Sequence, residues 1–158
     1  MIRIGQGYDI HRFTTGRPLI LGGYEVKEAA KGLHGHSDAD ALVHAVIDAI
    51  LGALALGDIG NWFPDTDDQW RGASGKQLLD AVLTAIRISG WRIVNVDSTV
   101  VTQSPKLAPH IWAIRDSLSK LLDVDISLVS VKAKTKEGLD AVGAGEALEA
   151  QAVVLLEN

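Results

Sequence analysis

The chain has 158 residues, of which 47% are apolar, a net charge of −5 and no cysteine. This length suits one domain with a substantial core, so we expect a single domain over residues 1–158. The negative charge argues against a general nucleic-acid binder, which would carry a basic surface. Because cysteine is absent, disulfides and thiolate metal sites are excluded, and any transition metal must bind to histidine and carboxylate side chains.

The N-terminus, MIRIGQGYDIHRF, lacks the basic region, the apolar stretch and the cleavage site of a signal peptide. The longest apolar run, about residues 41–57, is interrupted by His44 and Asp48. That interruption favours a buried helix over a membrane span. We therefore expect a cytoplasmic protein that does not insert into membranes.

Turn residues and alternating patterns predict several strands. The segment IRIGQGYDIHRF is typical of a short strand that turns at Gly5 and Gly7, and RPLILGGYEV of a hairpin that turns at Gly22 and Gly23. Further strands are predicted in WRIVNVDSTVVTQ, SLVSVKAKT and LEAQAVVLLE. The glycine-rich segment GLDAVGAGEA separates the last two.

Three helices are predicted between these strands. The first covers residues 38–56, with Ser37 or Asp38 as its cap. The second, SGKQLLDAVLTAIRISG, begins after a Ser74 cap and ends at Gly90, and the third is PKLAPHIWAIRDSLSKLL. The apolar residues expected on the inner faces of the second and third helices are Leu78, Leu79, Val82, Leu83 and Ile86, and Ile111, Ile114, Leu118, Leu121 and Leu122.

The order of these elements predicts an α/β sandwich in which one sheet carries helices on one face. The other face of the sheet also needs cover, and a second subunit is the simplest way to provide it. Between the first and second helices lies the polar loop LGDIGNWFPDTDDQWRG. A loop of this length suggests a function.

Polar side chains interrupt the apolar sequence of the first helix. Asp40, His44 and Asp48 recur every four residues, so they share one face of a helix. A solvated stripe would explain Asp40. A neutral histidine that is hydrogen-bonded to a carboxylate could be an ordinary part of the core.

The N-terminal YDIHRF supplies a second group of candidate ligands. Asp9 and His11 point the same way in an extended strand. Together with His44 they give a carboxylate and two imidazoles, and three protein ligands with an open fourth position describe a catalytic zinc site. Asp48 is then a candidate acceptor for the other ring N–H of His44. The Asp-x-His spacing by itself is common.

Five blocks of the sequence carry a family resemblance. They are IGQGYDIHRF, HSDADALVHAVIDAILGALALGDIGNWFPDTD, SPKLAPHI, VKAKTKEGLD and EAQAVVLL. In this order, and over essentially the whole chain, they resemble the 2-C-methyl-D-erythritol 2,4-cyclodiphosphate synthase family of the non-mevalonate isoprenoid pathway. The resemblance implies a homotrimer with active sites between adjacent subunits and sheets that surround a central cavity.

The resemblance also implies the substrate, 4-diphosphocytidyl-2-C-methyl-D-erythritol 2-phosphate. Its 2-phosphate attacks the β-phosphorus of its own diphosphate, and CMP leaves as the cyclic diphosphate closes. Asp9, His11 and His44 match the zinc ligands of the family, where the metal acts as a Lewis acid and template. Glu137 matches the ligand of a second cation, Mg²⁺ or Mn²⁺, that bridges the diphosphate.

Catalytic and substrate-binding residues follow from the same match. His36 and Thr135 match the residues that stabilise the transition state, and Ser37 matches a phosphate contact, whereas His34 has no counterpart and is expected at the surface. GDIGNWFPDTD matches a flap over the methylerythritol diol, and TQSPKLAPHI a cytosine pocket that is read by backbone groups. The implied substrate contacts are Asp9, His11, His36, Ser37, Asp58, Ile59, Gly60, Phe63, Pro64, Asp65, Thr66, Asp67, Thr102, Gln103, Ser104, Pro105, Lys106, Leu107, Ala108, Lys134, Thr135, Lys136 and Glu137.

The chain departs from many relatives at a few positions. They have Arg where this chain has Ala144, and Phe where it has Ala141. In the family these side chains face the central cavity, where an isoprenoid diphosphate has been proposed to bind. Without the arginine the cavity lacks a bidentate diphosphate clamp, so we expect no prenyl diphosphate there. Lys134 replaces a threonine of some relatives and adds a cation beside the phosphate site.

Two other functions compete with the synthase. A metal-dependent phosphohydrolase could use the same ligands to activate water, and it would release inorganic phosphate. A trimeric ligand-binding or sensor protein is the non-enzymatic alternative. Such a protein would be expected to lack a zinc ligand or His36, and this chain has all four residues.

Overall fold

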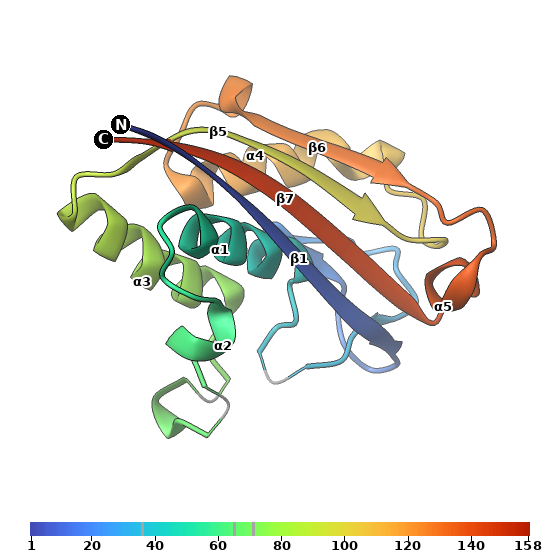
Figure 1. Cartoon of the computed structure of the whole chain (residues 1–158). Helices are drawn as coiled ribbons and strands as arrows, with labels where there is room; N and C mark the ends of the chain where they lie inside the picture. Colours follow the sequence, from blue (N-terminus) through green and yellow to red (C-terminus); the bar gives the residue numbers. More distant parts are fainter. Residues whose placement is uncertain (36, 65, 71) are drawn as a thin grey trace.

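The computed structural model describes residues 1–35, 37–64, 66–70 and 72–158 (Figure 1). Its main sheet has five strands in the order β4-β1-β7-β5-β6, and a separate hairpin pairs β2 with β3. The strands are β1 (Ile2–Thr14), β2 (Ile20–Leu21), β3 (Tyr24–Glu25), β4 (Gly32–Leu33), β5 (Arg92–Val101), β6 (Val129–Lys134) and β7 (Ala147–Glu157). The helices are α1 (Ala41–Ala53), α2 (Ile59–Trp62), α3 (Gly75–Ile88), α4 (Ile111–Leu122) and α5 (Asp140–Gly143), with short 3-10 helices η1 (Asp68–Trp70), η2 (Ala108–His110) and η3 (Ile126–Leu128).

The sheet is mixed, and helices cover one of its faces. β7 is antiparallel to both β1 and β5, whereas β6 is parallel to β5. α1 packs on β1 and β7, α4 packs on β6, and α3 packs against α1 and α4. Figure 1 shows β1 and β7 running side by side across these helices, with the two chain ends together. The predicted α/β fold, with one sheet and helices on one face, is confirmed for the described chain.

Gly5 and Gly7 do not form a turn, and that prediction was wrong. Both lie inside β1, which continues as one strand from Ile2 to Thr14. A Cβ atom on Gly5 would lie 1.9 Å from the Ala49 carbonyl oxygen of α1, and one on Gly7 would lie 1.9 Å from the Ala45 carbonyl oxygen. The glycines therefore allow the strand and the helix backbone to approach closely.

α1 is apolar on all sides because the sheet covers one side of it and α3 another. The helix begins later than predicted, since its N-cap is Asp40 and neither Ser37 nor Asp38. The Asp40 carboxylate accepts hydrogen bonds from the backbone N–H groups of Val43, at 3.0 Å, and Gly22, at 2.9 Å. The cap therefore also fixes the turn of the β2–β3 hairpin.

The other predicted elements agree with the structure to differing degrees. α3 has the expected Ser74 cap, which forms a capping box with Gln77. The β2–β3 hairpin turns at Gly22 and Gly23, as predicted. The third helix is shorter than predicted, because α4 begins only at Ile111, after the 3-10 helix η2.

The face of the sheet opposite the helices carries several exposed apolar side chains, most of them on β1. On β1 the side chains of Ile2 and Ile4 are 69% and 70% exposed, and those of Tyr8 and Ile10 are also exposed. Val153 of the neighbouring strand β7 is exposed as well. Within the described residues, no helix has the length and apolar character needed to cross a membrane.

The close approach of β1 to α1 can be tested with two glycines. Gly7→Ala places a methyl group against the α1 backbone, and we expect it to lower the free energy of unfolding by about 3 kcal/mol or more. Gly52→Ala, on an exposed position of α1 where the nearest atom to a Cβ is 3.7 Å away, is the matched control. We expect this control to raise the stability by about 0.5–1 kcal/mol. Urea unfolding of both variants measures the difference, and equal effects would contradict the packing argument.

Candidate metal centre and active-site pocket

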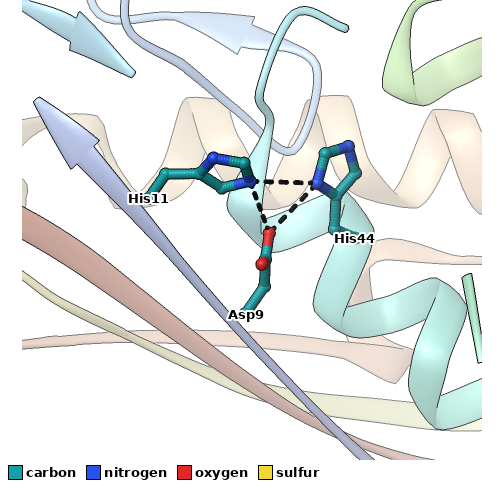
Figure 2. Close-up of side chains that lie close together, drawn as sticks. All are labelled: Asp9, His11 and His44. Atoms are coloured by element: carbon teal, nitrogen blue, oxygen red, sulfur yellow. Dashed lines mark hydrogen bonds and ion pairs between the residues drawn. The ribbon is translucent and has the colours of Figure 1, made fainter. Parts of the chain in front are cut away.

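Three predicted ligands lie together where β1 passes α1. Asp9 and His11 are two residues apart on β1 and point toward α1, which carries His44 (Figure 2). Asp9 Oδ2 lies 2.9 Å from His11 Nε2 and 3.0 Å from His44 Nδ1. The two ring nitrogens are 3.4 Å apart. The three side chains therefore converge with one donor atom each.

The outer nitrogen of each imidazole has its own partner. His11 Nδ1 lies 2.7 Å from the carbonyl oxygen of His34, to which it donates. His44 Nε2 lies 3.3 Å from Ser37 Oγ. When the inner nitrogens lose their protons to make room for a cation, the outer partners keep the outer nitrogens protonated, and each inner lone pair then faces the centre of the cluster, as a metal ligand requires.

Electrostatic interactions within the cluster shift two pKa values in opposite directions. Burial would raise the pKa of Asp9, but hydrogen bonds and charges from His11 and His44 outweigh it and hold the pKa well below its usual range. Burial would lower the pKa of His11, but the carboxylate of Asp9 raises it overall. Asp9 is therefore ionised at neutral pH, and the cluster attracts a cation.

The donor set fits a tetrahedral metal ion. Ligand atoms at about 2.0–2.1 Å from a tetrahedral zinc are separated by roughly 3.3 Å. The three separations in the cluster, 2.9, 3.0 and 3.4 Å, lie close to that value. A carboxylate and two imidazoles with space for a fourth ligand can therefore hold such an ion with little rearrangement.

Asp48 does not orient His44. Its carboxylate accepts a hydrogen bond of 2.7 Å from the backbone N–H of Ile59, at the start of α2. Burial raises the pKa of Asp48, and the Ile59 N–H opposes this shift. Asp48 therefore connects α1 to the start of α2. The partner of the outer His44 nitrogen, which was predicted to be Asp48, is Ser37.

The cluster lies in a pocket with a volume of about 610 Å³. The predicted flap forms one wall, in which the Phe63 ring packs edge-on against Trp70 at a centroid distance of 4.7 Å. Asp58 caps α2 by accepting from Asn61 N at 2.9 Å. The described residues that line the pocket are Asp9, His11, Gly35, Ser37, His44, Ile59, Gly60, Phe63, Pro64, Asp67, Trp70, Gly72 and Leu78.

The predicted site residues in the ranges 102–108 and 134–137 form a second group, at the ends of β5 and β6. Thr102 N donates to the carbonyl of Lys134 at 2.9 Å, and Thr102 Oγ1 donates to Ser104 O at 2.7 Å. None of the described residues in the ranges 102–108 and 134–137 lines the pocket around Asp9, His11 and His44. One chain thus carries two separate halves of the predicted site.

Thr135 and Glu137 lie together within the second group. The Thr135 hydroxyl donates to Glu137 Oε1 at 2.9 Å, and both side chains are exposed. Neighbouring Lys136 points elsewhere, since its ammonium group lies 3.2 Å from carboxylate oxygens of Asp140 and Glu149. Thr135 and Glu137 are therefore available to a ligand, whereas Lys136 is already ion-paired.

Two predicted site residues, His36 and Asp65, lie outside the described residues. Sequence reasoning also missed Arg17, whose guanidinium donates to the Gly35 carbonyl at 2.5 Å and to the Ser37 carbonyl. These bonds fix backbone groups next to the partners of both histidines of the cluster. No motif marks Arg17, because the acceptors are backbone groups.

Comparison with known proteins places this geometry in a family. Residues 2–157 match the YgbB family. The 2-C-methyl-D-erythritol 2,4-cyclodiphosphate synthase of Chromobacterium violaceum is 56% identical over 156 residues, which cover 99% of this chain and 98% of that protein.

Solved structures agree with the sequence relatives. A 2C-methyl-D-erythritol-2,4-cyclodiphosphate synthase described as bound to CDP matches with a TM-score of 0.90 and 41% identity, covering 98% of this chain and all of that one. The bifunctional IspDF of Campylobacter jejuni matches with a TM-score of 0.93 and 39% identity. The match covers 99% of this chain and 42% of the IspDF chain. The chain therefore belongs to the YgbB family, whose relatives named here include 2-C-methyl-D-erythritol 2,4-cyclodiphosphate synthases.

Proposed function

We propose that this protein converts 4-diphosphocytidyl-2-C-methyl-D-erythritol 2-phosphate into 2-C-methyl-D-erythritol 2,4-cyclodiphosphate and CMP. A P–O bond forms between a 2-phosphate oxygen and the β-phosphorus, and the bond from the β-phosphorus to the bridging oxygen breaks, so CMP leaves with that electron pair. In enzyme classes this is a cyclising phosphorus–oxygen lyase. The observation that supports it best is the Asp9–His11–His44 cluster in a pocket beside the flap.

We further propose that Asp9, His11 and His44 hold one Zn²⁺ per subunit. The metal supplies Lewis-acid stabilisation of phosphate charge when it is bound. The protein's part is to keep the donor atoms close together before binding, through the His34 carbonyl and the Ser37 hydroxyl. Such pre-organisation reduces the reorganisation that accompanies metal and substrate binding.

The remaining roles follow the family match residue by residue. His36 and Thr135 stabilise the transition state, and Ser37 adds a phosphate contact. The exposed Glu137 carboxylate holds Mg²⁺ or Mn²⁺ with the substrate diphosphate, since an all-oxygen site suits a hard cation. The flap residues 58–60 and 63–67 bind the methylerythritol diol, and backbone groups of residues 102–108 bind the cytosine.

A homotrimer would join the two halves of the site. The cluster around Asp9 and the group around Thr135 lie apart within one chain, so a complete site needs the second group of an adjacent copy. The exposed Ile2 and Ile4 side chains on the uncovered face of the sheet suit contact with another subunit. Around the resulting central cavity, the exposed Ala144 offers no cation to a prenyl diphosphate.

Incubation with the cytidyl substrate, zinc and magnesium, followed by ³¹P NMR, tests the activity. We expect the two coupled phosphorus signals of a cyclic diphosphate together with CMP. Inorganic phosphate and an unclosed product would instead identify a metal-dependent phosphohydrolase. Binding of the substrate without turnover would indicate a ligand-binding or sensor protein.

Metal content tests the ligand set independently of turnover. We expect His44→Ala to lose bound zinc and to lower turnover by about 10³-fold or more, because it removes one of three ligands. His110→Ala is the matched control, since His110 contacts Tyr24 and Glu28 and is not one of the three residues of the cluster. Elemental analysis of both purified variants measures the zinc, and full zinc content in His44→Ala would contradict the assignment.

The pKa shifts predict how zinc affinity depends on pH. Because the pKa of His11 in the metal-free protein is raised above 6.5, metal binding below that raised value must displace a proton. We expect the affinity to fall by at least tenfold per pH unit there, whereas Asp9 stays ionised and adds no further dependence. Competition against a zinc chelator from pH 5.5 to 8.5 measures the slope, and a constant affinity over this range would contradict the argument.

A further inference from the structure

A second pocket lies away from the Asp9–His11–His44 cluster, where the ends of α1 and α3 meet the beginnings of β1 and β5. It has a volume of about 340 Å³, which is within the range of small-molecule sites. None of its lining residues belongs to the predicted synthase site. They are Arg3, Leu54, Leu56, Trp62, Ala85, Ile86, Ser89 and Trp91.

The pocket combines apolar walls with one cationic group. Arg3 lies two residues before Gly5 on β1, so its side chain leaves the strand on the helix side. No described residue forms a hydrogen bond or ion pair with its guanidinium. Two of the other polar side chains are engaged, since the Trp62 indole donates to Leu56 O at 3.1 Å and the Ser89 hydroxyl to Ala85 O at 3.0 Å. Arg3 is therefore the group that can select a ligand by charge.

We propose that this pocket is a binding site for a small aromatic carboxylate. The indoles of Trp62 and Trp91 offer flat apolar surfaces that suit an aromatic ring. The guanidinium of Arg3 forms a planar fork that matches the two oxygens of a carboxylate, and no described residue forms an ion pair with it. The ring would pack between the apolar walls, and the carboxylate would pair with Arg3 at the edge of the pocket.

Helix α2 connects this pocket to the one around Asp9, His11 and His44. Trp62 lines the pocket around Arg3, whereas Ile59 and Gly60, in the same turn of helix, line the pocket around the three side chains. The turn is held at its start by the hydrogen bond from Ile59 N to Asp48 and at its end by the Trp62 indole. A ligand that packs on Trp62 adds a further restraint, so occupancy of the pocket around Arg3 restrains α2.

Binding can be followed with 2-naphthoate as the probe, because the chain contains four tryptophans. In ¹H–¹⁵N spectra of the full chain, the indole signals of Trp62 and Trp91 should shift and saturate as naphthoate is added. Trp112, which is 66% exposed on α4, is the internal reference and should not move. Single Trp→Phe variants assign the signals. Equal shifts at Trp112, or shifts that do not saturate, would mean non-specific association and overturn the proposal.

The role of Arg3 is tested with a matched ligand and a matched variant. Neutral 2-naphthamide has nearly the same shape as naphthoate and should bind at least tenfold more weakly. Arg3→Gln should remove this difference, whereas Lys120→Gln, at an exposed cation on α4, should leave it unchanged. Equal binding of acid and amide to the unmodified protein would overturn the charge-based assignment.

Hydrogen exchange tests the connection through α2, without any need for turnover. Saturating naphthoate should slow exchange of the Ile59 amide several-fold, and Arg3→Gln should abolish this effect at the same ligand concentration. Unchanged exchange at Ile59 in a protein that binds naphthoate would show that ligand binding does not restrain α2. Because none of these experiments uses the cytidyl substrate, their outcome is independent of the proposed synthase activity.

Discussion

The close contact between the backbones of β1 and α1 is the constraint on which the rest of the structure depends. Gly5 and Gly7 let the strand lie against the carbonyl groups of the helix. At that separation the imidazole of His44 reaches Asp9 at 3.0 Å. Any side chain at either glycine would push the helix outward and pull the donor atoms apart. The packing of the core and the geometry of the Asp9–His11–His44 cluster are therefore set by the same contact.

This dependence explains which features were predictable from the sequence. The period of a strand correctly put Asp9 and His11 on the same side of β1. That His44 joins them was a hypothesis from the residue types, and the family resemblance supported it; the structure does bring the three side chains together. The glycines were misread as a turn, since a glycine inside a strand and a glycine in a turn look alike without knowledge of the helix above it. The orientation of His11 by the His34 carbonyl could not be predicted, because every residue has a carbonyl and only the fold selects one.

Asp48 shows a further limit of pattern-based reasoning. Its spacing from His44 correctly predicted that both side chains lie on one face of α1. Neighbouring positions on a helix do not determine which groups pair, however, and the start of α2 offered a backbone N–H at 2.7 Å. An unpaired N–H at the beginning of a helix is a strong donor, so the carboxylate satisfies it while Ser37 serves His44. The positions of Ile59 and Ser37 in the fold thus determine the partners of Asp48 and His44.

Two carboxylates outside the cluster, the half-buried Asp38 and the buried Asp40, connect the segment before α1 to neighbouring elements. Asp40 is only 1% exposed, yet its charge is met by backbone N–H groups of Gly22, Gly23 and Val43. Asp38 likewise accepts from Gly75 N, at the start of α3, at 3.0 Å. A carboxylate with several donors can remain buried because these hydrogen bonds replace its hydration. The loop is thereby tied to the hairpin, to α1 and to α3. It follows that the positions of the His34 carbonyl and the Ser37 hydroxyl depend on carboxylates that are not among the three side chains of the cluster.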